Sequence, residues 1–410
     1  MKPDLKKAVL SKLNKLDVIA LAEDLIRIPS LTGQERACAL YVYKLLNKEG
    51  FETYLQKVEP GRPQVIAYIR GNGKGKSLML NGHLDSDPIT GSWPKDPFQP
   101  FRDGNRLWGA GINNMKSGLA ALLAAAIAVK RANVLLAGDL VIACVVGELQ
   151  GGRGTVHMLK SGIRADMAIV AEPYSIRNII TKCVGVHKFA INTIGRSIHV
   201  SRKEKGVDAI EKMLKVISAL KRLKFNVKDP DLPGVPRLTV SSIIGGRNRD
   251  YDLSGVSSIA DFATILVDLR YPQGITSQEI DKKVIAMLNK LKKEDRDFQF
   301  EYEHPPNKRF RVGGTDMPPM DMPSDMEIVN VIRANYKVVT GKNIENIGAV
   351  IPLSYCGNDT AHLQRAGIEC CLYGPRGYDD EVDKHVRIDE MIACSRVLAG
   401  CVVDICANHR

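Results

Sequence analysis

The chain has 410 residues, of which 44% are hydrophobic and 25% are charged, a composition typical of a soluble globular protein. The length exceeds that of one ordinary hydrophobic core, so two domains are expected. We find no apolar run that approaches the ~20 residues needed to cross a bilayer. The N-terminal segment reads as an amphipathic helix rather than a signal peptide, and we therefore expect no membrane partner.

The formal net charge is +12, from 58 Lys and Arg against 46 Asp and Glu. A basic surplus can indicate nucleic-acid binding. Here the densest basic stretches, 203–228 and 282–296, also contain acids, and no aromatic-plus-basic stripe accompanies them. We expect a solvated basic surface, or mild steering of anionic substrates, and no nucleic-acid partner. The nine scattered cysteines form no CxxC pair, which suggests neither a disulfide framework nor a structural zinc site and fits the cytoplasm best.

The first part of the chain alternates strand and helix patterns. The predicted elements are helices at 4–26 and 34–49, strands at 63–70 and 77–81, a helix after Lys116, a strand at 139–146, a helix from Thr155 and a strand at 166–171. This alternation indicates an α/β sheet, whose ligands gather at the carboxyl ends of its strands. His83, Glu148 and Glu172 each follow a predicted strand. Their shared placement predicts a site at that edge.

The pattern changes after about residue 184. Strands are predicted at 185–195, 237–245, 260–270 and 297–303, with helices at 207–223 and 277–293. A strand–helix–strand–strand–helix–strand series is the split βαβ pattern of a small two-layer domain. We therefore expect a catalytic domain formed by 1–184 and 313–410, interrupted by an inserted domain at 185–312. The last part adds helices at 325–341 and 388–407 and strands at 346–351 and 368–373.

The loop after residue 82 carries His83-Leu84-Asp85. This spacing is typical of a metal ligand with its orienting partner, because the imidazole binds metal through one nitrogen while a nearby carboxylate accepts from the other. By itself a His-x-Asp sequence is more often an ordinary surface loop with a stray histidine.

Several short motifs strengthen this interpretation when taken together. They are Gly82-His83-Leu84-Asp85, the Trp93, Pro97 and Phe98 segment, Glu148-Leu149, Glu172-Pro173, Gly195 to His199, Asp268 to Arg270, and Gly374-Pro375. The set resembles the metallopeptidase and deacylase family of acetylornithine deacetylase, succinyl-diaminopimelate desuccinylase, aminoacylase and glutamate carboxypeptidase. The resemblance covers nearly the whole chain.

This resemblance implies a mixed-sheet, zinc-peptidase-like α/β catalytic domain with an inserted α+β, ferredoxin-like lid or dimerisation domain. It implies a metal-dependent hydrolase of small amide substrates that forms a homodimer through the insertion. Glu148 stands where the family has its general base, and Asp85 would orient His83. His199 would hydrogen-bond the oxyanion. Arg270 and Asn248 would bind a substrate carboxylate.

The sequence departs from the family at its second metal site. The family's bridging aspartate aligns with Asn114, and a carboxylate ligand aligns with Leu149. The late histidine ligand falls near Asp379 and Asp380, and either of these, Glu381 or His385 could take its place. A neutral amide is a poor bridge between two dications, and a leucine cannot ligate. We therefore expect one divalent metal per chain, zinc first with manganese or cobalt as alternatives, on His83, Glu172 and either Asn114 or an acid such as Asp380.

Each candidate also has a purely structural interpretation. Glu148 could cap the following helix, and Glu172 could be a turn residue before a proline. His199 could be a packed histidine, and Arg270 could pair with Asp268. The histidines that we interpret as structural or surface residues by default are His157, His187 and His362.

The favoured hypothesis is a one-metal amidohydrolase that acts on an N-acyl amino acid or a short peptide-like amide. Two alternatives stay open. The same scaffold could run a different one-metal reaction, such as deamination or amide formation, or it could be a non-catalytic binding protein.

Overall fold

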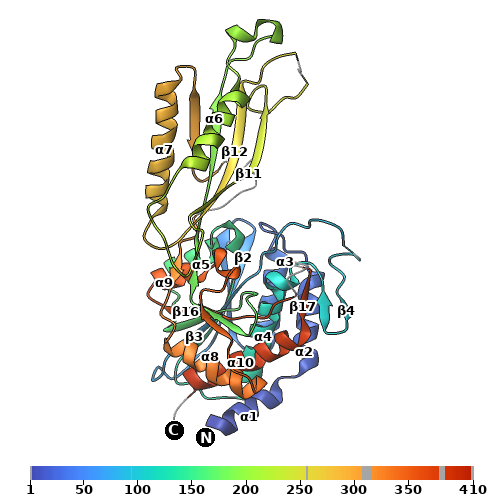
Figure 1. Ribbon diagram of the computed structural model, residues 1–410. Helices are drawn as coiled ribbons and strands as arrows, with labels where there is room; N and C mark the ends of the chain where they lie inside the picture. The colour runs from blue at the N-terminus through green and yellow to red at the C-terminus, as the bar shows by residue number, and fades with distance from the viewer. Residues whose placement is uncertain (1, 94, 255–256, 307–315, 378–383, 408–410) are drawn as a thin grey trace. The chain divides into compact units, whose positions relative to one another are not determined.

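The computed structural model describes residues 2–93, 95–254, 257–306, 316–377 and 384–407 (Figure 1). The described chain divides into two compact units. The first unit comprises 1–182, 320–354 and 358–410, and the inserted unit comprises 183–319 and 355–357. The sequence patterns place the end of the insertion at 312 and give no indication that 355–357 join it.

The first unit is built on a mixed sheet that has eight strands within the described residues. In spatial order these are β1 (Glu52–Glu59), β2 (Arg62–Ile69), β6 (Leu140–Val145), β3 (Leu78–His83), β7 (Met167–Val170), β16 (Glu369–Leu372), β8 (Asn178–Ile180) and β15 (Asn346–Gly348). Strands β6, β3, β7 and β16 pair in parallel, whereas β1 with β2 and β2 with β6 pair antiparallel. The central strands β6, β3 and β7 are fully buried, as near-continuous apolar runs require. The predicted mixed α/β sheet is confirmed.

Helix α4 (Ser117–Arg131) is the core helix of this unit and packs against α10 (Ile388–Cys406), which in turn contacts α8 (Glu327–Thr340) (Figure 1). The segment Ile112–Arg131, which includes the preceding π-helical turn η1 (Ile112–Lys116), is long and apolar enough to cross a bilayer by length and composition. This corrects the expectation that no such run exists. Because 94% of its apolar window is buried inside the protein, the segment is explained by core packing.

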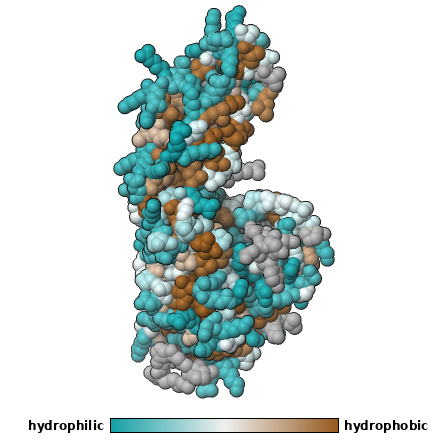
Figure 2. Space-filling view, viewed as in Figure 1, coloured by the Kyte–Doolittle hydropathy of each residue, from teal (hydrophilic) through white to brown (hydrophobic). Residues whose placement is uncertain are grey.

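The inserted unit is a four-stranded antiparallel sheet, within the described residues, carrying two long helices. The elements are β10 (Gly185–Ile194), α6 (Ala209–Arg222), β11 (Arg237–Gly246), β12 (Phe262–Tyr271), α7 (Ser277–Glu294) and β13 (Gln299–Glu303). Their chain order and the spatial order β11-β12-β10-β13 confirm the predicted split βαβ arrangement. Helix α7 begins with a capping box formed by Thr276 and Glu279. Figure 2 shows apolar surface over the strands of this unit, and the exposed apolar side chains of edge strand β11 include Ile243 and Ile244.

The remaining elements are mostly short. They are β4 (Phe101–Asp103), β5 (Arg106–Trp108), η2 (Glu148–Gln150), α5 (Arg153–Lys160), β9 (Lys182–Cys183), η3 (Val200–Lys205), β14 (Met320–Asp321), η5 (Leu353–Tyr355), α9 (Thr360–Arg365) and β17 (His385–Arg387). Sequence analysis missed β1 and most of these strands. Pieces of two or three residues have no periodicity to detect, and β1 is a half-exposed edge strand with a polar sequence.

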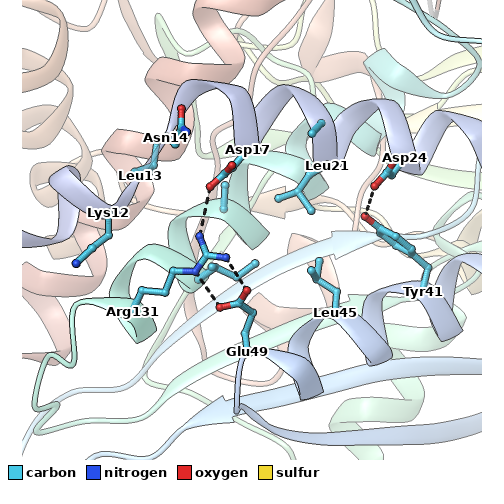
Figure 3. Close-up of a pocket in the computed structure, with 13 residues that line it drawn as sticks. Lys12, Leu13, Asn14, Asp17, Leu21, Asp24, Tyr41, Leu45, Glu49 and Arg131 are labelled. Carbon is cyan, nitrogen blue, oxygen red and sulfur yellow. Dashed lines mark hydrogen bonds and ion pairs between the residues drawn. The ribbon is translucent and has the colours of Figure 1, made fainter.

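The helix predicted at 4–26 is wrong as a single element. The chain forms α1 (Lys2–Lys12) and α2 (Lys15–Arg27), and each of the two helices contacts both α4 and α10. Figure 3 shows how charged pairs join α2, α3 (Arg36–Lys48) and α4 around a surface hollow. Arg131 donates to both oxygens of Glu49 at 2.9 and 2.6 Å and to Asp17 at 3.3 Å. Tyr41 also donates to Asp24 at 2.9 Å, so these pairs across the hollow are explained by helix packing.

The start of α4 lies against the end of β7 at a point where glycine is required. A Cβ added to Gly118 would lie 1.9 Å from the carbonyl oxygen of Ala171. We predict that Gly118→Ala lowers the free energy of unfolding by about 1–3 kcal/mol, because overpacking forces the helix away from the strand. Urea denaturation measures this. The matched control is Ser117→Ala, whose buried hydroxyl has no hydrogen-bond partner in the described structure; an equally small effect in both variants would contradict the close approach.

Candidate metal centre

Three ionisable side chains meet at the carboxyl ends of neighbouring parallel strands. His83 is the last residue of β3, Glu148 follows β6, and Glu172 follows β7. Their potential ligand atoms all lie within 4.8 Å of one another, and His83 Nε2 is 3.6 Å from Glu172 Oε1. The side chains are almost fully buried, with exposed fractions of 1%, 6% and 5% for these residues in chain order. The structure therefore brings the three predicted residues together.

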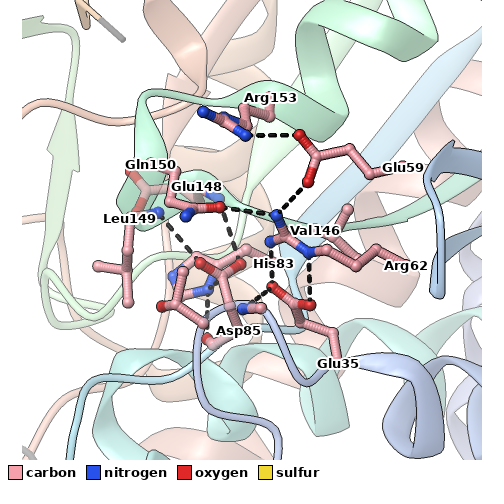
Figure 4. Close-up of polar contacts among 12 residues, drawn as sticks. Glu35, Glu59, Arg62, His83, Asp85, Val146, Glu148, Leu149, Gln150 and Arg153 are labelled. Carbon is pink, nitrogen blue, oxygen red and sulfur yellow. Dashed lines mark hydrogen bonds and ion pairs between the residues drawn. The ribbon is translucent and has the colours of Figure 1, made fainter. Parts of the chain in front are cut away.

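Asp85 holds the turn that carries Glu148. Its carboxylate oxygens accept from the backbone N–H groups of Glu148 and Leu149, both at 3.1 Å (Figure 4). Asp85 contacts His83 chiefly through its backbone, because the carbonyl oxygen lies 2.8 Å from His83 Nδ1 while the carboxylate is 3.6 Å away. The orienting group for the imidazole is thus the carbonyl of Asp85, where the sequence motif predicts its carboxylate.

A buried arginine network supports the same turn from the other side. Arg62 Nε donates to Glu35 at 2.9 Å, and Arg62 Nη1 donates to Glu59 and to Gln150 Oε1, each at 2.8 Å (Figure 4). Glu35 is fully buried and Arg62 nearly so. Because an uncompensated buried charge is costly, this pairing fixes η2 and, through it, the backbone of Glu148.

The enclosed charges perturb one another. Burial raises the pKa of Glu148 well above its usual range, and the neighbouring Glu172 raises it further. Burial also raises the pKa of Glu172, while His83 opposes this shift. For His83, burial alone would lower the pKa, but Glu172 and Asp85 outweigh it and raise the pKa to about 10. The site therefore carries an excess of carboxylate that favours a cation beside it.

Asn114 lies at the nitrogen that would bind a metal. Its Oδ1 is 3.1 Å from His83 Nε2, and its Nδ2 donates to Asp87 Oδ2 at 3.4 Å. Leu149 is half-buried and offers no ligand atom. The structure thus brings His83, Glu172 and Asn114 together as predicted.

The alternative late ligands are only partly described. Asp379, Asp380 and Glu381 lie outside the described residues. His385 is buried on β17, and its ring centroid lies 4.7 Å from that of Trp108.

The residues fit a divalent metal. Glu172 Oε1 is buried and has no hydrogen-bond partner among the described residues, and buried carboxylate oxygens are otherwise almost always satisfied. The imidazole of His83 and the carboxylate of Glu172 are ligands that divalent metals such as zinc and manganese accept, and the second carboxylate, that of Glu148, adds negative charge beside them.

Asp359 is a further buried acid near the centre that sequence analysis missed. It stands immediately before α9, where an aspartate normally caps the helix, yet its side chain makes no capping hydrogen bond. Burial raises its pKa to about 7, although the charge of His83 opposes the shift. The sequence does not reveal that Asp359 is buried near His83, because an aspartate directly before a helix is normally explained as an N-cap.

Three of the predicted site residues, His199, Asn248 and Arg270, lie in the inserted unit. His199 is exposed, and its Nδ1 accepts from Ser201 N at 3.2 Å, so the ring proton lies on Nε2 as an outward donor. Arg270 donates from Nε and Nη2 to both oxygens of Asp268, at 2.6 and 2.9 Å, and from Nη1 to a backbone carbonyl at 3.2 Å. The structural interpretation of Arg270 is therefore the one observed. Asn248 has a φ of 57°, and its backbone N–H donates to Asp261 at 2.7 Å.

A second group of potential metal ligands lies in the inserted unit. The sequence motifs predict a single group for the whole chain, the one around His83. Within the described residues, His187, His304 and Asp316 also place ligand atoms within 4.8 Å of one another. Sequence analysis interprets His187 as structural by default, because its strand gives no sign of the distant partners.

Metal affinity at the first centre should rise with pH. With a pKa raised to about 10, metal-free His83 is protonated at neutral pH, and the metal must displace that proton. We expect the association constant to rise on the order of tenfold per pH unit between about pH 6 and 8, with at least one proton released. Calorimetric titration in buffers of different ionisation enthalpy measures both. Affinity that is independent of pH would contradict this assignment, and His83→Ala should abolish the proton release.

Comparison with known proteins places this geometry in context. The model of peptidase family M20/M25/M40 matches residues 79–404, which is most of the chain. Two curated relatives are N-formyl-4-amino-5-aminomethyl-2-methylpyrimidine deformylases. The one from Halalkalibacterium halodurans is 28% identical and the alignment covers 96% of this chain and 95% of the relative. The one from Bacillus subtilis is 26% identical, with 97% and 96% covered.

Solved structures agree at the level of the fold. A dipeptidase from Saccharomyces cerevisiae superposes with a TM-score of 0.77 at 13% identity, covering 97% of this chain and 98% of that one. At this identity the likeness concerns the fold alone. It includes both the mixed catalytic sheet and the inserted antiparallel sheet.

Proposed function

Because the chain belongs to peptidase family M20/M25/M40, and is thus a metal-dependent hydrolase of linear amide C–N bonds, we propose that it removes a short acyl group from a small amine. The observation that carries this proposal is the buried group of His83, Glu148 and Glu172. We propose zinc as the native metal, one per centre, with manganese or cobalt as substitutes.

The family chemistry requires an activated water, a polarised carbonyl and a proton for the leaving amine. A divalent metal held by His83 and Glu172 supplies Lewis acidity when bound. Glu148 takes the proton from the attacking water and gives it to the amine nitrogen. Its burial suits this exchange, because burial raises its pKa and makes the carboxylate a stronger base toward water.

Two further residues serve the reaction in this proposal. Asp85 positions Glu148 through the backbone of η2. His199 offers its Nε2–H to the carbonyl oxygen as negative charge develops there, since its Nδ1 is already occupied by Ser201.

The one-metal proposal is supported by what stands around His83. Leu149 contributes an aliphatic side chain where a second metal would need a carboxylate. Asn114 Oδ1 faces His83 Nε2. This amide oxygen is a neutral metal ligand, which suits a single dication better than a bridge between two.

The pairing of Arg270 bears on the substrate. Its Nε and Nη2 are paired with Asp268 and its Nη1 donates to a backbone carbonyl, so Asp268 already offsets the positive charge that a substrate carboxylate would meet. This favours an acylated amine without a carboxylate over the N-acyl amino acids expected from the sequence. N-formyl amines, including the formylated aminopyrimidine named for the two relatives, are the first substrates to test.

We also propose that the protein is a homodimer joined through the inserted unit. Strand β11 is a sheet edge, and its Ile243 and Ile244 are 55% and 44% exposed. On the neighbouring helix α6, Ile210 and Leu214 are 40% and 56% exposed. An unpaired edge beside exposed apolar side chains is a surface that another copy can cover.

The direct test is Glu148→Gln assayed on a panel of N-formyl amines and N-acetyl and N-succinyl amino acids. We predict turnover of N-formyl amines by the wild type and a loss of about 10²–10⁴-fold in kcat in the variant, because the general base is gone. Metal content should be unchanged. Glu345→Gln, at the surface, is the matched control and should keep full activity.

Full turnover by Glu148→Gln would refute the assigned base. A metal-loaded wild type that hydrolyses nothing in the panel would instead favour the non-catalytic or altered-reaction alternatives. Preference for the amino acids would return Arg270 to a substrate-binding role.

A further inference from the structure

A polar cluster lies inside the inserted unit, apart from the residues assigned to catalysis. His187 is on β10, His304 directly follows β13, Asp316 precedes the last residues of the insertion, and Asp281 is on α7. His187 is fully buried. Segments from four parts of the sequence thus converge on one imidazole.

Each histidine has one nitrogen held by an oxygen acceptor and the other nitrogen turned toward Asp316. His187 Nε2 is 2.7 Å from Asp281 Oδ1, and His304 Nδ1 is 3.0 Å from the carbonyl oxygen of Lys188. The other nitrogens, His187 Nδ1 and His304 Nε2, lie 2.5 and 3.4 Å from Asp316 Oδ1. Metal-binding histidines show this pattern, in which the far nitrogen donates to a carboxylate or a carbonyl.

The outer contacts extend one residue further. The Tyr302 hydroxyl donates to Asp281, so the carboxylate that orients His187 is itself held in place. A histidine that serves only in core packing does not require an oxygen acceptor at each ring nitrogen. His187 and His304 both have one at each nitrogen.

We propose that His187 Nδ1, His304 Nε2 and Asp316 form a second, structural site for a divalent metal of the zinc class, separate from the catalytic centre. In tetrahedral coordination with bonds of about 2.0–2.2 Å, neighbouring ligand atoms are about 3.3–3.5 Å apart. The separation of 3.4 Å between His304 and Asp316 already matches. The His187 to Asp316 separation must widen by roughly 0.8 Å as a metal replaces the shared proton. Water would complete the fourth position.

The location gives such a site a structural purpose. Val186 and Met317 exchange backbone hydrogen bonds of 2.7 and 3.0 Å, and His187 and Asp316 are their chain neighbours. A metal here would tie the first strand of the insertion to its final segment and to the end of β13. It would therefore stabilise the inserted unit by cross-linking its beginning and its end.

The test is metal content per chain in the full-length protein, reloaded with zinc after chelation. Because the proposal is independent of the catalytic centre, we use His83→Ala to empty that centre. We predict that His83→Ala keeps one equivalent, and that adding His304→Asn removes it. Adding His157→Asn instead, a histidine outside both groups, should leave the equivalent in place. Chelation should lower the Tm of His83→Ala but not that of the double variant with His304→Asn.

Asp316→Asn provides a second route if the histidine variant does not fold, since it keeps the size of the side chain and should also lose the metal. The proposal is overturned if His83→Ala binds no zinc, or if the equivalent that it binds survives both His304→Asn and Asp316→Asn. A wild type with one equivalent that depends on His304 and not on His83 would support this site while refuting the metal assignment at the catalytic centre.

Discussion

The parallel pairing of β3, β6 and β7 sets the chemistry of the first unit, because it delivers an imidazole and two carboxylates to one buried edge. Water cannot solvate these charges there, and the pKa values of Glu148 and Glu172 rise in response. A cation beside them lowers the repulsion between the two carboxylates. The two carboxylates raise the pKa of His83 to about 10, and a dication that binds its imidazole would take the place of the proton.

The surrounding residues hold this edge in place. Asp85 fixes the backbone after β6, and Arg62 braces the same turn through Glu35 and Gln150. Gly118 allows α4 to approach the carbonyl beside Glu172. Core packing and charge pairing therefore act together, since each fixes a backbone segment from which a ligand projects.

A buried histidine beside carboxylates also occurs in the inserted unit, with different residues. His187 is buried between Asp281 and Asp316, and His304 adds a second imidazole. Here the ligands come from strand ends and a returning segment, whereas in the first unit they follow parallel strands. The recurrence explains why the structure shows two groups suited to a metal although the sequence motifs predict one.

Sequence analysis predicts the parts whose pattern is local. The buried strands, the split βαβ insertion and the residues that follow strand ends, such as His83 and Glu172, all have a short-range signature. The partners of Asp85 are not predictable in this way, because its carboxylate bonds to a turn more than sixty residues away. Asp359 and His187 were missed for the same reason: each has a sufficient local explanation, and its significance lies in contacts between distant segments.

The most direct test of the central claim is anomalous diffraction at the zinc edge from crystals of the zinc-loaded chain. The one-metal centre predicts a single peak beside His83 Nε2 and Glu172, with Glu148 near but not bound. A pair of peaks about 3.5–4 Å apart, the spacing of two-metal sites, with Asn114 between them, would contradict it and restore a two-metal mechanism.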